Sequence, residues 1–176
     1  MRLGAPTGAF VLWASLAAGQ PNGGTKPAES PRRFGLVAGI GNSVGGIGVG
    51  GEAYLAHSRL SLFGGVGYLH AWGSDYSSEG LGVAGGARLF TAGRRHRGFL
   101  EASLSPVSVA GTVINGVVVE KRTSYGPGFS IGYQFVSSSG ITLVLANGVA
   151  YGMTGPDFAR GTQLLATYAV GYTWRR

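Results

Sequence analysis

Large apolar side chains alternate with small or polar ones in the last part of the chain, from Leu164 to Trp174. Because successive side chains of a β-strand point to opposite faces, a period of two predicts a strand with one apolar face. That face ends in two aromatic residues, which is typical of a strand whose outer side contacts lipid. The alternation therefore predicts a strand of a membrane β-barrel. The residues on its apolar face are Leu164, Ala166, Tyr168, Val170, Tyr172 and Trp174.

The same alternation recurs in seven earlier segments, and none of the eight shows helical spacing over a useful length. Strands that cross a membrane in a barrel need about 9–11 residues, and the segments are close to this length. Single-chain bacterial barrels also have an even number of strands. The predicted fold is all-β, an eight-stranded antiparallel up-and-down transmembrane β-barrel. Its strands are expected at Phe34–Asn42, Ile47–Leu55, Leu60–His70, Leu81–Phe90, Gly98–Val107, Ser124–Phe135, Ile141–Met153 and Gln163–Trp174.

The connections between these segments alternate in length. Short turns on the periplasmic side and longer loops on the outer side are the pattern of outer-membrane barrels. The first outer loop, Ser43–Gly46, is short and departs from this pattern. The short connections are 56–59, 91–97 and 136–140, and the longer ones are 71–80, 108–123 and 154–162.

The longest loop contains a turn motif of its own. Asn115-Gly116 lies between β-branched residues, and Asn-Gly in that setting predicts a hairpin. We therefore expect the strands to extend above the membrane there, where they would offer a contact surface for adhesion.

The two faces of the segments differ in a way that decides which of them points inward. One face carries most of the large apolar residues, whereas the other is mostly Gly, Ala and Ser with three charges and a few aromatics. The second face has too few charged side chains for a surface in contact with water. It fits the lumen of an eight-stranded barrel, which has room only for packed side chains. The apolar face is therefore expected to face lipid, where closure of the barrel satisfies the backbone hydrogen bonds.

The aromatic residues form two groups when the first strand is taken to run outward from the periplasm. Aromatic girdles are expected at both interfaces of a membrane barrel. The outer girdle is expected at Tyr68, Trp72, Tyr76, Tyr125 and Tyr151, and the periplasmic girdle at Phe34, Tyr133, Phe135, Tyr172 and Trp174.

The N-terminal region has the composition of a secretory signal peptide. Arg2 precedes the short apolar stretch Ala9–Ala18, and cleavage close to Gly19 fits the small residues there. The stretch is too short to span a bilayer as a helix, and the alternative is a buried helix of the mature domain. The chain has the length of one domain. We expect a signal peptide over 1–19, a flexible periplasmic linker over 20–33 and the barrel over 34–176, exported by the general secretory route to the cell outer membrane.

Charge and cysteine content narrow the range of partners. Charged residues make up 12% of the chain, about half the share usual in soluble proteins. The formal net charge is +7, but the arginines lie at segment ends and turns and form no basic helix, which argues against nucleic acid as a partner. The turn Arg94–Arg97 is expected to face the periplasm, beside inner-leaflet phosphates or an acidic partner. The absence of cysteine excludes a disulfide scaffold, a Cys-ligated metal and a lipoprotein anchor.

From Phe34 to Trp174 the chain resembles the small eight-stranded outer-membrane barrels, the OmpA-like and OmpX-like group. The resemblance rests on strand count, loop alternation, the girdles and the alternating terminal strand. It implies the fold far more than an activity, and it implies insertion by the barrel-assembly machinery. Such barrels commonly end on the aromatic residue that this machinery reads, whereas Arg175 and Arg176 follow Trp174 here.

Arg88 and Glu101 are the clearest polar pair on the predicted lumen face. If the basic turn between their strands is the centre of a hairpin, Arg88 lies opposite Glu101. A cross-strand ion pair would compensate charges that are costly to bury alone. Glu52 and Gln134 lie at similar depth and could join a network with this pair. We predict that this network is structural and blocks the lumen, and the alternative is a polar gate on a narrow water or ion path.

His70, Ser74 and Asp75 are the alternative catalytic residues, because barrel enzymes that modify lipid A place such side chains near the outer rim. General-base chemistry needs the histidine within hydrogen-bond reach of the hydroxyl, and the spacing around a loop is not specific for that geometry. The glycine cluster Gly45–Gly51 is followed by strand alternation rather than a helix, so it is not a phosphate-binding loop. No set of residues has metal-ligand spacing, and no metal or cofactor is expected.

Together these patterns predict a non-enzymatic outer-membrane barrel with a narrow packed lumen and a structural or surface-interacting role. A solute-conducting porin needs about 16 strands. The expected partners are outer-membrane lipids, including lipopolysaccharide, and the assembly machinery, and the expected state is a monomer. The alternatives are a lipid-modifying barrel enzyme of the lipid A acyltransferase or deacylase type, and a secreted soluble barrel that binds an apolar ligand.

Overall fold

A computed structural model describes residues 32–55, 59–72, 77–114, 117–154 and 161–175, without the side chains of 71–72, 77–78 and 110–122. The described chain forms eight strands and one short 3-10 helix, η1. The expected signal peptide and most of the expected linker lie outside the described residues. The elements are β1 (Arg32–Gly41), η1 (Asn42–Val44), β2 (Gly46–Leu55), β3 (Leu60–Trp72), β4 (Ser77–Phe90), β5 (His96–Ile114), β6 (Val117–Val136), β7 (Ile141–Gly152) and β8 (Gly161–Arg175).

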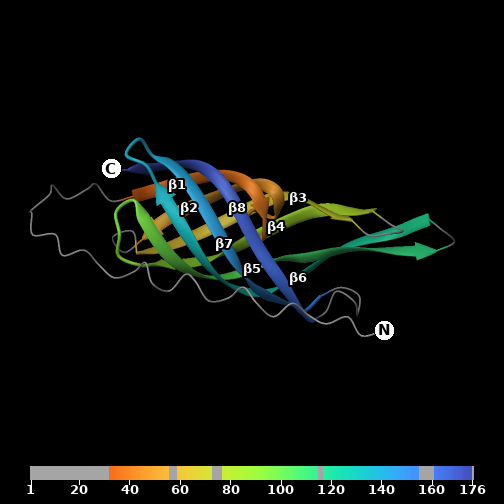
Figure 1. The fold of residues 1–176 in the computed structure, drawn as a ribbon. Coiled ribbons are helices and arrows are strands. Elements are labelled where there is room, and N and C mark those ends of the chain that lie inside the picture. The colour runs from red at the N-terminus through yellow and green to blue at the C-terminus, as the bar shows by residue number, and fades with distance from the viewer. Residues whose placement is uncertain (1–31, 56–58, 73–76, 115–116, 155–160, 176) are drawn as a thin grey trace, which may run out of the picture.

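The strands form one closed barrel in which each strand pairs antiparallel with its neighbours in sequence (Figure 1). Pairing of β1 with β8 closes the barrel, so neither strand is left as a free edge. The predicted eight-stranded antiparallel up-and-down barrel is therefore confirmed. In the part of the chain that the structure describes, no helix is long and apolar enough to cross a membrane.

Seven of the eight strands are longer than the alternation predicted, β5 and β6 most of all. β1 begins at Arg32, inside the expected linker. The ladder between β5 and β6 runs as far as the pair Ile114 and Val117. The segment 108–123 is therefore mostly a continuation of these two strands, which confirms the strand extension that the Asn-Gly motif predicted, and the turn itself at 115–116 lies outside the described residues.

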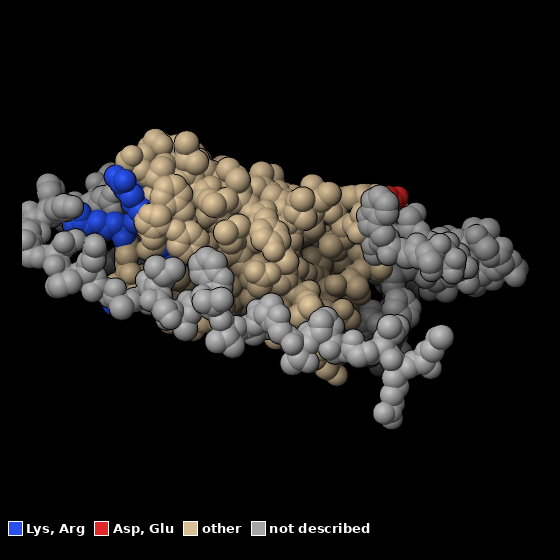
Figure 2. Space-filling model, viewed as in Figure 1, with Lys and Arg blue, Asp and Glu red and all other residues tan. Residues whose placement is uncertain are grey.

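The outer surface of the barrel is apolar. Exposed large hydrophobic side chains lie on all eight strands, and two of them, Leu81 and Ile131, are each 65% exposed. Figure 2 shows a broad band without charged side chains between a basic end and an end with an acidic side chain. Asn147 is a polar exception on this surface. The large apolar face of the strands therefore lies outside, and the small and polar face lies inside.

Side chains fill the interior of the barrel. The ring of Phe90 lies 6.0 Å from that of Tyr54 and 5.5 Å from that of Phe99, centroid to centroid. Gly132, opposite Phe99 on β6, leaves room for this packing, because a Cβ there would lie 2.1 Å from the Phe99 ring. The aromatic cluster occupies the end of the barrel at which β1 begins and β8 ends, which we call the turn end. The opposite end, beyond which β5 and β6 continue, is the hairpin end.

Candidate functional site

Arg88 and Glu101 face each other across the β4–β5 ladder inside the lumen. The ladder pairs Arg88 with Glu101 directly, and Arg88 Nε donates a hydrogen bond of 2.8 Å to Glu101 Oε2. Both residues are almost fully buried, at 3% and 1% exposure. A buried charge is costly without a partner, so each of these charges depends on the other.

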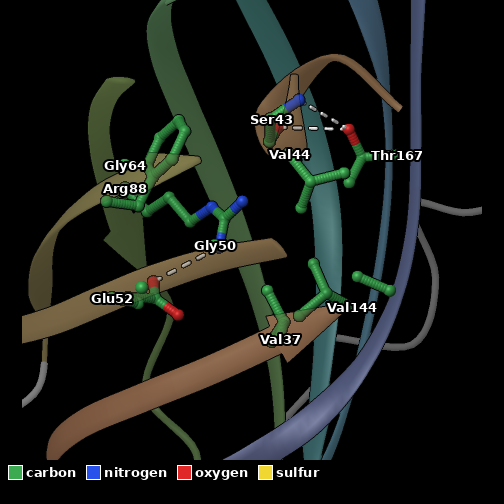
Figure 3. Close-up of a pocket in the computed structure, with 12 residues that line it drawn as sticks. Val37, Ser43, Val44, Gly50, Glu52, Gly64, Arg88, Val144 and Thr167 are labelled. Carbon is green, nitrogen blue, oxygen red and sulfur yellow. Dashed lines mark hydrogen bonds and ion pairs between the residues drawn. The ribbon is translucent and has the colours of Figure 1, made fainter. Parts of the chain in front are cut away.

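Glu52, on β2, is the second carboxylate that contacts Arg88. Arg88 Nη1 lies 3.4 Å from Glu52 Oε1, and Figure 3 shows the two side chains pointing toward each other. Ser61 Oγ donates to Glu52 Oε1 at 2.5 Å, and Tyr54 Oη donates to Glu52 Oε2 at 2.8 Å. Gln134 Nε2 adds a bond of 3.1 Å to the same oxygen. The structure therefore brings together all four residues of the lumen network expected from sequence.

Two further arginines enter this network at the turn end. Arg32 Nη1 and Arg97 Nη2 donate to Gln134 Oε1 at 3.2 and 2.6 Å. The Arg97 guanidinium also lies 3.9 Å from the centroid of the Phe90 ring, a cation–π contact. Arg97 was expected to face the periplasm with the rest of the basic turn, and that expectation is wrong: only 3% of it is exposed.

The first loop folds into the barrel at the hairpin end and closes it, and we call Asn42–Val44 the plug. Ser43 Oγ donates to Glu101 Oε1 at 2.8 Å, and the Ser43 backbone N–H donates to Thr167 Oγ1 at 3.2 Å. Val44 is 1% exposed, inside the lumen (Figure 3). Ser43 and Val44, expected in a short outer loop, are therefore part of the lumen.

Glycines make the inward course of the plug possible. Gly45, just after the plug, has φ +75°, a backbone conformation that favours glycine. On β3, a Cβ at Gly65 would lie 2.5 Å from the carbonyl oxygen of Ser43, and one at Gly67 would lie 2.6 Å from that of Val44. The wall of small residues opposite the plug is thus a packing surface that larger side chains would destroy.

The network and the plug together leave little free space between them. Hydrogen bonds and ion pairs run from Arg32 through Gln134, Glu52, Arg88 and Glu101 to the plug. The cavity between plug and network offers about 10 Å³ to the centre of a water molecule, near the least that holds one ordered water. The arrangement is suited to hold the barrel rigid and closed. No group of three or more His, Cys, Asp or Glu among the described residues could hold a metal ion.

The expected aromatic girdles lie at the two ends of the outer surface. At the hairpin end, Tyr68 and Tyr151 are exposed and Tyr125 is half-buried, whereas the Trp72 side chain and Tyr76 lie outside the described residues. At the turn end, the Trp174 ring lies 5.9 Å from that of Phe34 and 4.9 Å from that of Tyr172. His96 stacks near Tyr133 and Phe135 on the same rim.

The three alternative catalytic residues are not brought together within the described residues. His70 Nδ1 lies 4.0 Å from Glu79 Oε2, a partner that sequence analysis did not consider. Ser74 and Asp75 lie outside the described residues. The contact between His70 and Glu79 joins two half-exposed side chains at the rim of the barrel.

Sequence reasoning missed Arg97, Arg32 and the plug for different reasons. Arg97 falls on the same strand face as Phe99 and Glu101 in the period-two alternation. Extending the predicted β5 strand by a few residues toward its N-terminus would therefore have placed it in the lumen. Arg32 has the parity of the outer face, but a register shift between Arg32 and Phe34 turns it inward. No pattern of residues in the sequence predicts the register shift in β1 or the inward course of the plug.

Comparison with known proteins supports the fold. No protein-family model matches the chain, and no curated protein matches its sequence. In fold it is similar to the crystal structure of Ail, the attachment invasion locus protein of Yersinia pestis, with a TM-score of 0.53 and 12% sequence identity. The match covers 82% of this chain and 99% of Ail. At that identity the likeness shows the eight-stranded barrel fold alone.

Substitution of Glu101 by Gln is expected to destabilise the barrel, because Arg88 then keeps only Glu52 as a charged partner. Breaking a buried ion pair typically costs about 3–5 kcal/mol. We expect about 3 kcal/mol here, measured from urea unfolding by the fraction of heat-modifiable protein on gels. Glu79→Gln is the control, since its pair with His70 is half-exposed and is expected to contribute less than about 1 kcal/mol. Equal losses for the two variants would contradict a central role of the lumen network.

Substitution of Gly65 by Ala is expected to displace the plug, because its Cβ would overlap the Ser43 carbonyl. The readout is amide hydrogen exchange at Ser43, which we expect to accelerate at least tenfold when its bond to Thr167 is lost. Gly64→Ala is the matched control on the same strand, where the nearest atom to a Cβ is 3.8 Å away. Unchanged protection of Ser43 in Gly65→Ala would show that the plug does not depend on this contact.

Proposed function

We propose that this protein is a non-enzymatic outer-membrane barrel with a closed lumen that presents its β5–β6 hairpin at the cell surface as an interaction site. The observation that carries the proposal is the length of this hairpin. The pairing of β5 with β4 ends at Leu104 and Gly85, yet β5 continues to Ile114. Figure 1 shows the hairpin projecting beyond the other strands.

Placement in a membrane follows from the outer surface. Large apolar side chains cover all eight strands, and aromatic residues lie near both ends of this surface. Exposure of so much apolar area to water would be unfavourable, since each Å² removed from water contributes about 25 cal/mol. Barrel closure satisfies the backbone groups that lipid cannot. The outer membrane is the membrane in which such barrels occur, and outer-membrane lipids, including lipopolysaccharide, are the proposed surroundings.

The orientation follows from the connections. At the turn end the strands are joined by short segments such as 91–95 and 137–140, whereas the long hairpin lies at the other end. Short turns face the periplasm in outer-membrane barrels. The hairpin then lies outside the cell, and its β6 strand pairs with β7 only from Gly128 onward in the described ladder. Strand edges of this kind pair with extended segments of other proteins.

The interior supports a role without transport or ligand storage. The pocket between the network and the plug has room for about one water molecule, which is too little for an apolar ligand. Ail, whose name describes an attachment and invasion protein, has a similar fold. For this chain we propose a surface interaction role, which the projecting β5–β6 hairpin supports independently of the likeness to Ail.

Whole-cell labelling tests both the membrane placement and the exposure of the hairpin. The chain has no cysteine, so Asn115→Cys and Arg95→Cys each introduce a single thiol. In a Gram-negative host, a membrane-impermeant maleimide is expected to label Asn115→Cys in intact cells and Arg95→Cys only after the outer membrane is opened. Recovery of the protein in the soluble periplasmic fraction, or labelling of Arg95→Cys in intact cells, would contradict the proposal.

A further inference from the structure

Exposed arginines surround the barrel at its turn end. Arg33 lies on β1, Arg59 precedes β3, and Arg94 and Arg95 lie in the turn between β4 and β5; all four are exposed. Hydrogen bonds place them on one rim, because the Arg59 carbonyl accepts from the Phe90 N–H at the end of β4, 2.8 Å away. Arg175 Nη2 donates to the carbonyl oxygen of Ser137 at 2.8 Å and continues the rim past β6 and β7. We call Arg33, Arg59, Arg94, Arg95 and Arg175 the arginine rim.

Among the described residues, no ion pair joins a carboxylate to Arg33, Arg59, Arg94 or Arg95. The described carboxylates are those of Glu52 and Glu101, buried in the lumen, and of Glu79, at the opposite end. Figure 2 shows the basic side chains gathered at one end of the barrel. The chain at and beyond the hairpin end carries both signs in the sequence, for example Glu120 beside Lys121 on β6. The arginine rim is therefore a one-signed surface that attracts anions.

The rim lies just beyond an aromatic girdle. Arg33 directly precedes Phe34, whose ring stacks on that of Trp174, and Arg175 directly follows Trp174. Aromatic residues of membrane proteins lie at the level of the lipid headgroups. A guanidinium one residue further out reaches the level of the phosphates, and its planar donors bind phosphate oxygens in pairs.

We propose that the arginine rim binds the phosphate groups of anionic phospholipids in the periplasmic leaflet and so fixes the depth and direction of the barrel in the membrane. The inference rests on the proposed membrane placement, and it adds a ligand class and a site to it. The zwitterionic headgroup of phosphatidylcholine carries its own cation, whereas phosphatidylglycerol offers an unpaired phosphate charge. The rim is therefore expected to prefer phosphatidylglycerol.

Native mass spectrometry of the detergent-solubilised barrel, titrated with phosphatidylglycerol or phosphatidylcholine, tests this preference. The test variant is the double substitution Arg94→Gln and Arg95→Gln, which removes two exposed charges. A basic residue near an anionic membrane contributes about 1 kcal/mol, so we expect phosphatidylglycerol affinity to fall roughly thirtyfold. Arg94→Lys with Arg95→Lys keeps the charge and is expected to lose less than about threefold.

The matched control is Lys121→Gln with Arg122→Gln, which removes the same charge from the β6 strand beyond the hairpin end of the barrel. It is expected to leave phosphatidylglycerol affinity unchanged. Equal binding of both lipids by the wild type, or an equal loss of affinity in the control variant, would overturn the inference. Lipid A is titrated as well, and a loss of lipid A binding in place of phosphatidylglycerol binding in the Arg94 and Arg95 variant would also overturn it. A protein that migrates as a heat-modifiable barrel but shows no lipid preference would overturn only the proposed lipid binding by the arginine rim. A protein that is soluble in water without detergent would overturn the proposed function as well.

Discussion

The guanidinium of Arg88, held between the carboxylates of Glu52 and Glu101, is the interaction on which the rest of the lumen depends. A membrane barrel with an apolar exterior must keep its charges inside or at its ends. Inside, a charge is costly to bury unless a partner compensates it. Glu52 connects the pair to Gln134 and the turn end, whereas Glu101 receives the Ser43 hydroxyl of the plug. One buried cation therefore joins four strands and the first loop into a single closed unit.

The barrel separates its charges by position. The lumen holds three described arginines and two glutamates, the outer wall is nearly uncharged, and the exposed arginines lie on the rim of the turn end. Arg88 contacts both glutamates, whereas Arg32 and Arg97 join the network through Gln134. Each location corresponds to a different surrounding: charges held by ion pairs and hydrogen bonds in the buried lumen, apolar groups where lipid is expected, and cations where phosphates are expected. The hairpin of β5 and β6 extends beyond the barrel, and it is the part that we propose as the interaction site.

The sequence predicted the fold well because period-two alternation is a local property that barrel closure preserves in every strand. The same alternation identified the cross-strand partners Arg88 and Glu101, since a hairpin register follows from its turn. Arg32 could not be found this way, because a register shift at the start of β1 reverses its direction. The plug could not be found either, since its inward course depends on space that distant glycines on β3 provide.

Contact between side-chain methyl groups and lipid tests the account most directly. In phosphatidylcholine nanodiscs, nuclear Overhauser effects to acyl-chain protons are expected for Val170, Leu104 and Ile131, which are exposed on the outer wall. The buried residues Val144, Val44 and Leu165 are expected to show none, although Val144 and Val170 lie on neighbouring strands. Lipid contacts at Val144 and Leu165, with water contacts at Val170, would show that the barrel faces its surroundings the other way round.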